Sequence, residues 1–84
     1  MHMIYNSQAY CVVEFELEDD LLNIHGGFEI MDKTARRETY IGGLLAHRFR
    51  LEVAELVEAD LPSDEIDDYL SAFDSIMVHP LALH

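Results

Sequence analysis

Residues 36–57 read RRETYIGGLLAHRFRLEVAELV, and within this stretch the apolar pattern changes from that of a strand to that of a helix. The segment 36–41 is predicted as a strand, and Gly42-Gly43 turns the chain. From Leu44 to about Ala59, apolar side chains recur with the 3.6-residue period of an amphipathic helix. The stretch therefore marks the boundary between a part built from strands and a part built from helices.

Strand patterns precede this boundary. The segment 10–17, YCVVEFEL, alternates from one side to the other like a strand. The segment 28–33 is predicted to pair with 36–41 as an antiparallel hairpin, with Thr34-Ala35 as a short connection. The sheet then has three strands, or four if residues 3–6 pair at its edge.

Helix patterns follow the boundary. Asp60-Leu61-Pro62 stops the first helix, and a second helix is predicted from Ser63 through Met77, before Pro80 ends it. Strands followed by helices predict an α+β fold, with a small antiparallel sheet of three to four strands and two amphipathic helices packed on one face. At 84 residues the chain is expected to form a single domain. Its parts are mainly strands in 1–43, two helices in 44–78 and a tail in 79–84.

The same patterns predict a core shared by the sheet and both helices. In the first long strand, Cys11, Val13, Phe15 and Leu17 share one face, whereas Tyr10, Val12, Glu14 and Glu16 share the other. The expected core residues are Cys11, Val13, Phe15, Phe28, Ile30, Ile41, Leu45, Phe49, Val53, Leu56, Ile66, Leu70 and Phe73.

Acidic residues dominate the charge, since 17 Asp and Glu stand against 5 Lys and Arg, for a formal net charge of -12. A field of that sign repels nucleic-acid phosphates and anionic membranes, so no nucleic-acid or membrane partner is expected. The N-terminal residues lack the basic and apolar regions of a signal peptide, and no apolar run approaches the roughly 18–20 residues of a membrane span. We therefore expect a cytoplasmic protein.

The short chain has few ways to stabilise itself. A domain of this length buries only about 60–65% of the surface that its unfolded form exposes. Cys11 is the only cysteine, which excludes an internal disulfide. A homodimer is therefore expected as a way to bury more surface.

The charges are segregated along the chain. Lys33, Arg36 and Arg37 crowd the tip of the predicted hairpin, and we call them the basic hairpin. From Glu52 to Asp74 there are nine acidic residues and no basic one. The acidic corner, as we name the cluster around the predicted helix–helix turn, consists of Glu52, Glu55, Glu58, Asp60, Asp64, Glu65, Asp67 and Asp68.

Part of the acidic corner opposes local helix preference. Glu55, Glu58 and Asp60 lie at the C-terminal end of the first predicted helix, where the dipole disfavours each anion by about 0.3–1 kcal/mol at low salt. One interpretation is a solvated face in an acidic protein. The other is a docking patch for a basic protein surface or for the basic hairpin of a second copy. The second interpretation gives the leading hypothesis, a non-enzymatic interaction module.

No catalytic constellation or cofactor motif is found, so neither an enzyme nor a cofactor is expected. Cys11 lies among apolar strand residues with no histidine nearby in sequence, which indicates a small core residue rather than a nucleophile. The alternative function is a metal- or small-ligand-binding domain that uses His2, His79 and His84, because chain termini often lie close together. These histidines lack the paired spacing of structural zinc sites.

Several stretches together carry a resemblance that runs nearly end to end. They are Met3-Ile4-Tyr5-Asn6-Ser7, Tyr10-Cys11-Val12-Val13-Glu14-Phe15, Gly26-Gly27-Phe28-Glu29-Ile30-Met31-Asp32-Lys33, Arg36-Arg37-Glu38, Phe73-Asp74-Ser75 and Leu83-His84. The chain resembles a family of small betaproteobacterial proteins of unknown function. The resemblance implies a bacterial cytosolic setting and carries over no catalytic residue.

Overall fold

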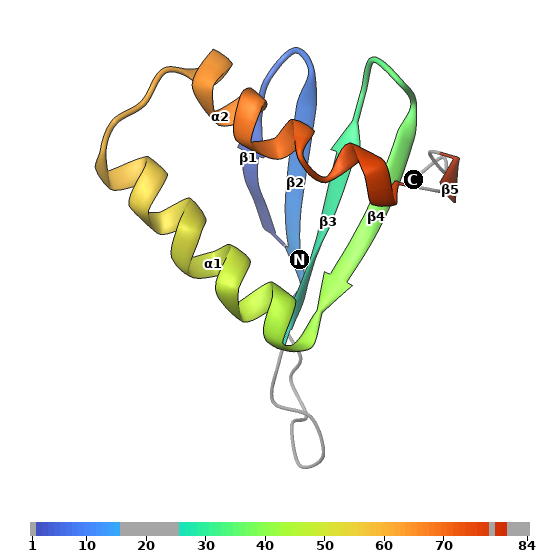
Figure 1. Cartoon of the computed structure of the whole chain (residues 1–84), viewed down its shortest axis with the longest axis horizontal. Helices are drawn as coiled ribbons and strands as arrows, with labels where there is room; N and C mark the ends of the chain where they lie inside the picture. The colour runs from blue at the N-terminus through green and yellow to red at the C-terminus, as the bar shows by residue number, and fades with distance from the viewer. Residues whose placement is uncertain (1, 16–25, 78, 81–84) are drawn as a thin grey trace.

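The computed structural model describes residues 2–15, 26–77 and 79–80. Strands come first in the chain and helices follow, so the predicted α+β class is confirmed (Figure 1). The elements are β1 His2–Asn6, β2 Tyr10–Phe15, β3 Gly27–Asp32, β4 Arg37–Gly42, α1 Gly43–Glu58, α2 Ser63–Ser71, the 3₁₀ helix η1 Asp74–Ile76 and β5 His79–Pro80. All neighbouring strands are antiparallel, in the order β1-β2-β3-β4-β5. The edge strand expected at residues 3–6 is present as β1.

The pairing of β2 with β3 decides which face of the sheet meets the helices. Val12 lies opposite Ile30, and both are buried in the cluster that includes helix residues. Cys11, Val13 and Phe15 therefore point away from the helices. Cys11 and Val13 are buried as predicted, but they lie outside the core cluster that the helices cover. Both faces of β2 are apolar, so alternation alone did not distinguish them, whereas the register with β3 does.

The core lies between the helix-facing side of the sheet and the two helices. Phe49 of α1 is at its centre, 1% exposed, with ring centroids 4.9 Å from Phe28 and 5.4 Å from Phe73. The predicted Leu45 is 46% exposed, because α1 turns Ala46 and Phe49 toward the sheet instead. The buried core cluster consists of Tyr10, Val12, Phe28, Ile30, Ile41, Ala46, Phe49, Leu70 and Met77.

Ionic and cation–π contacts hold α1 against the sheet. Arg50 Nη2 lies 2.6 Å from Glu14 Oε2, and the Arg50 guanidinium lies 5.0 Å from the centroid of the Phe28 ring. Such a stacked guanidinium contributes about 0.5–1 kcal/mol at an exposed site. Gly43 begins α1 with φ of +62°, a conformation that favours glycine.

The connection between β3 and β4 is longer than the two residues predicted. Residues 33–36 form the turn, and Arg36 adopts φ of 60° outside the strand. The Arg36 N–H donates to the Asp32 carbonyl at 2.8 Å, and the Ala35 N–H donates to Asp32 Oδ1 at 2.9 Å. The aspartate side chain thus stabilises a turn that lacks the glycine usually needed there.

The last predicted helix is also shorter than its apolar period suggested. α2 ends at Ser71, and i→i−3 hydrogen bonds then tighten the chain into η1. Residues 79–80, expected as part of a tail, form β5, which pairs with β4. The predicted strand end at 16–17 and the tail at 81–84 lie outside the described residues.

Candidate interaction site

The acidic corner surrounds the turn that joins α1 to α2. Asp60 follows α1 with φ of 56°, the left-handed conformation that commonly ends a helix. Asp64 and Glu65 lie in the first turn of α2, where the helix dipole favours anions. Six side chains of the corner are exposed, namely Glu55, Glu58, Asp60, Asp64, Glu65 and Asp68. The turn therefore presents carboxylates to solvent from the ends of both helices.

The other two acids of the corner, Glu52 and Asp67, are half-buried and bound by hydroxyl groups. Tyr69 Oη donates a hydrogen bond to Glu52 Oε1, which ties α2 to α1. Tyr5 Oη and Ser7 Oγ each donate to Asp67 Oδ1 at 2.8 Å, which ties α2 to the β1–β2 turn. These two carboxylates hold the helices in place, so they are poor candidates for binding a partner.

The tyrosines remain hydrogen-bond donors over the ordinary pH range. Burial raises the pKa of Tyr69, and the nearby Glu52 carboxylate raises it further. Burial also raises the pKa of Tyr5, with a further contribution from its hydrogen bond to Asp67. Both hydroxyls therefore stay protonated wherever their carboxylate partners are ionised.

The basic hairpin lies at the tip of β3 and β4, and much of its charge is engaged within the chain. Lys33 Nζ donates to the Ser7 carbonyl at 2.6 Å. Arg37 Nη1 donates to the Met77 carbonyl at 3.5 Å. Arg36 is exposed at the tip of the turn. Two of the three cations thus have partners in their own chain.

A carboxyl pair beside this hairpin was missed by the reasoning from sequence. The carboxyls of Asp32, at the end of β3, and Asp74, at the start of η1, are neighbours, and each shifts the pKa of the other. Tyr10 Oη lies 3.1 Å from Asp74 Oδ1 and 3.2 Å from Asp74 Oδ2, close enough to donate to either oxygen. The pair and the tyrosine join η1 to β2 and β3.

The two carboxyls differ in pKa. Burial raises the pKa of Asp74, and the neighbouring Asp32 raises it further. Burial alone would raise the pKa of Asp32 as well, but the Ala35 N–H, the Asp74 carboxyl and the Arg37 charge bring it below its usual value. When the pair holds a single proton, that proton therefore resides on Asp74. Asp32 lies two positions after the buried Ile30, so strand alternation was a signal that could have placed it on the buried face.

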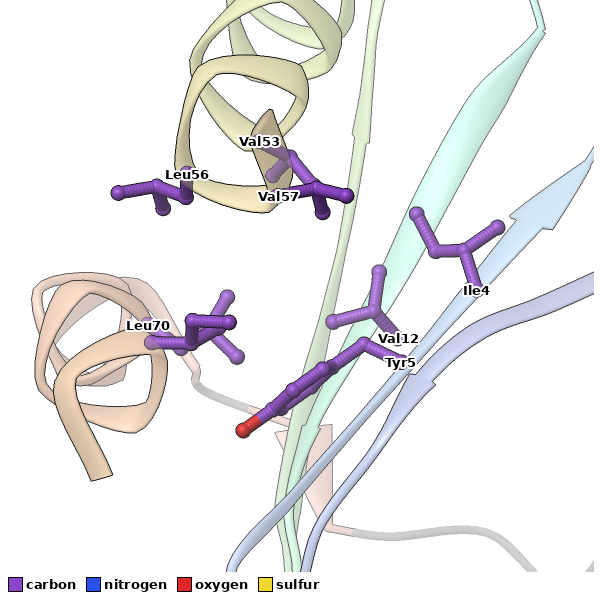
Figure 2. Close-up of a pocket in the computed structure, with 8 residues that line it drawn as sticks. Ile4, Tyr5, Val12, Val53, Leu56, Val57 and Leu70 are labelled. Carbon is purple, nitrogen blue, oxygen red and sulfur yellow. The ribbon is translucent and has the colours of Figure 1, made fainter. Parts of the chain in front are cut away.

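An apolar groove lies between α1, α2 and the β1 edge of the sheet, beside the acidic corner (Figure 2). Its lining residues are Ile4, Tyr5, Val12, Val53, Leu56, Val57, Ile66 and Leu70. Val12 and Leu70, each 1% exposed, form its floor, whereas Ile4 and Val57 are 40% and 63% exposed at its rim. The cavity volume is about 20 Å³. That is far below the roughly 300–1,000 Å³ of a small-molecule site and close to the space of one water-sized group.

The groove depends on an irregularity that the sequence patterns did not reveal. The register of β1 against β2 shifts between Met3 and Tyr5, as in a β-bulge. Consecutive residues of a regular strand point to opposite faces, but Ile4 and Tyr5 both line the groove. The bulge therefore supplies one wall of the groove at the edge of the sheet.

The structure does not bring the candidate metal ligands His2 and His79 together. His2 belongs to β1 and the backbone of His79 to β5, at opposite edges of the sheet. Four strand spacings of about 4.8 Å separate such positions by roughly 19 Å. His84 lies outside the described residues. Among the described side chains, no three His, Cys, Asp or Glu residues are grouped so that they could hold a metal ion.

Cys11 is buried on the face of the sheet that points away from the helices. Burial raises the pKa of its thiol, which opposes formation of the reactive thiolate. Within the part of the chain that the structure covers, no helix is both long and apolar enough to cross a membrane.

The strand order and the helices on one face of the sheet define a small α+β domain with an acidic corner and an adjoining apolar groove. The chain belongs to the family described as "Protein of unknown function (DUF3567)", which matches residues 1–84. It is 51% identical over 85 residues to "Protein BTH_I0359" of Burkholderia thailandensis, with 100% of both chains covered. No solved structure matches. These matches confirm the resemblance to a bacterial family of unknown function, and neither description indicates an enzyme.

Proposed function

We propose that this protein is a non-enzymatic interaction module that docks a basic protein through its acidic corner. The observation that carries the proposal is the exposure of six carboxylates around one helix–helix turn, in a stretch of sequence without Lys or Arg. Charges arranged in this way steer a basic partner toward the corner and increase the rate of association.

The contacts of the basic hairpin favour a different protein as partner over a second copy of this chain. Lys33 is bonded to Ser7, and Arg37 is bonded to Met77. A second copy that docked through its hairpin would have to meet Lys33 and Arg37 in the positions where these bonds hold them, whereas an unrelated basic surface is not tied to that geometry.

The experiment that tests the proposal compares three proteins in affinity capture from bacterial cytosol at low salt. The first is the wild type. The corner variant combines Glu55→Gln, Glu58→Gln, Asp64→Asn and Asp68→Asn, which leaves the tyrosine-bound Glu52 and Asp67 intact. The control variant neutralises Glu16, Glu18, Asp19 and Asp20 in the same way, so both variants carry the same net charge.

A basic protein that is retained by the wild type and the control but lost by the corner variant would support the proposal. Its retention should weaken as salt rises, because the Debye length falls from about 30 Å at 0.01 M to about 8 Å at 0.15 M. If all three proteins recover the same partners, the acidic corner serves solubility and the proposal is wrong.

A further inference from the structure

We infer that the partner of the acidic corner is a lysine- or arginine-rich segment that inserts one aliphatic side chain into the groove between α1, α2 and β1. This inference rests on the proposed function and adds the chemistry of the contact. The partner must carry both positive charges and an aliphatic side chain. A polycation without such a side chain does not meet this requirement.

The lining of the groove defines the anchor. All the surfaces around it are apolar or aromatic, and they belong to four different elements, as Figure 2 shows for the labelled side chains. A cavity of about 20 Å³ has room for the end of one side chain and no polar floor that would hold a water molecule. The exposed Val57 and Ile4 at its rim are already accessible, so a branched aliphatic end can enter without unfolding either helix.

The charges beside the groove define the flanks of the anchor. Glu65, which is exposed, directly precedes Ile66 of the groove lining on α2, so one free carboxylate lies beside the groove on that helix. Glu58 directly follows Val57 at the other rim, and Asp60 lies at the end of the same helix. A segment with cations on both sides of its anchor is therefore complementary to this site, whereas an acidic or neutral segment is not.

Three synthetic peptides test which chemical features of a partner the site recognises. The first alternates lysine and glycine with one central leucine, the second replaces that leucine with glycine, and the third keeps the leucine but replaces every lysine with glutamate. Binding is measured by fluorescence anisotropy at low salt. Burying only the end of a leucine should make the first peptide bind roughly tenfold more tightly than the second.

A matched pair of variants tests whether the groove causes the preference for the leucine peptide. Val57→Ser removes an apolar group from the rim at a position that is 63% exposed, and Leu51→Ser removes one at a position of α1 outside the groove that is 57% exposed. Both sites are exposed, so both variants should fold, as circular dichroism will check. The preference for leucine should disappear in Val57→Ser and persist in Leu51→Ser.

The other outcomes overturn the inference in distinguishable ways. Equal, salt-sensitive binding of the first two peptides would leave the acidic docking function standing and remove the apolar anchor. Absence of binding by any peptide would contradict both proposals. Binding of the glutamate peptide as tight as that of the first would remove the charge requirement. Self-association of the wild type that Val57→Ser abolishes, measured by analytical ultracentrifugation, would assign the groove to a second copy instead.

Discussion

Replacing Asp74 with asparagine tests the carboxyl pair that it forms with Asp32. The pKa of Asp74 is raised in the folded protein, by burial first and then by Asp32. The stabilising effect of this group is therefore fully present below the ordinary carboxyl pKa and is lost as the pH rises through the raised value. At neutral pH, Asp74→Asn removes the repulsion between two carboxylates, while the amide oxygen still accepts the Tyr10 hydroxyl.

The size of the effect follows from the surroundings of the pair. Two unit charges about 4 Å apart repel by about 1 kcal/mol in water and by about 4 kcal/mol at an effective dielectric constant of 20. Asp74 is only half-buried, and Arg37 offsets part of the repulsion, so the lower end applies. We expect Asp74→Asn to raise the free energy of unfolding by about 1 kcal/mol at neutral pH, or Tm by about 4–8 °C.

The assay is urea unfolding followed by circular dichroism at a series of pH values. The gain should shrink as the pH falls and vanish below the ordinary carboxyl pKa of 3.8, where Asp74 is protonated in both states. In the wild type Asp32 acts in the opposite direction, because its lowered pKa stabilises the fold above that pH.

The control is Asp68→Asn, which removes the same net charge from an exposed position on α2. A loss of 1 kcal/mol or more in Asp74→Asn at neutral pH, without a loss in the control, would contradict the reasoning. It would mean that the Asp74 carboxylate is a net favourable partner of Tyr10 and Arg37.

Three further predictions concern stability and are checked by the same urea titrations. Phe49→Ala should lower the free energy of unfolding by about 3–5 kcal/mol, because it empties the centre of the core, and a loss below 1 kcal/mol would contradict that placement. Asp60→Gly should raise the free energy of unfolding by about 1 kcal/mol, because glycine adopts the left-handed φ without strain and the change removes an anion from the C-terminus of α1. An unchanged free energy of unfolding would refute this. Tyr69→Phe should lower it by about 1–2 kcal/mol through loss of the hydrogen bond to Glu52, and a neutral result would show that water replaces the hydroxyl.

The fold class followed from the sequence because strand and helix periods are local properties. The face of β2 did not, since Tyr10 and Val12 on one side are about as apolar as Cys11 and Val13 on the other. The choice was made by the pairing of Val12 with Ile30, a contact between segments that lie far apart in the chain. The alternation within a single strand does not identify the residues that it pairs with.

The candidate site was predictable to a similar extent. The position of the acidic corner at the helix–helix turn follows from the sequence. The hydrogen bonds that engage Glu52 and Asp67 do not, because Tyr69 is 17 positions from Glu52 and Tyr5 is 62 positions from Asp67. The apolar groove depends on the bulge that lets Ile4 and Tyr5 both line it, and no residue pattern in β1 predicts this bulge. Only the buried position of Asp32 could be predicted, because Asp32 lies two residues after Ile30 and therefore on the same buried face of β3.

The sequential order of the sheet has a consequence for synthesis of the protein on the ribosome. β1 to β4 emerge before either helix and pair with one another in chain order, so the register among these four strands needs nothing from α1 or α2, and only β5 is added later. The helix-facing side of the sheet, with Val12, Phe28 and Ile30, then stays uncovered until residues 43–76 have been made. At about 5–20 residues per second this interval lasts on the order of a few seconds, and it is the period in which the nascent chain is most prone to aggregate.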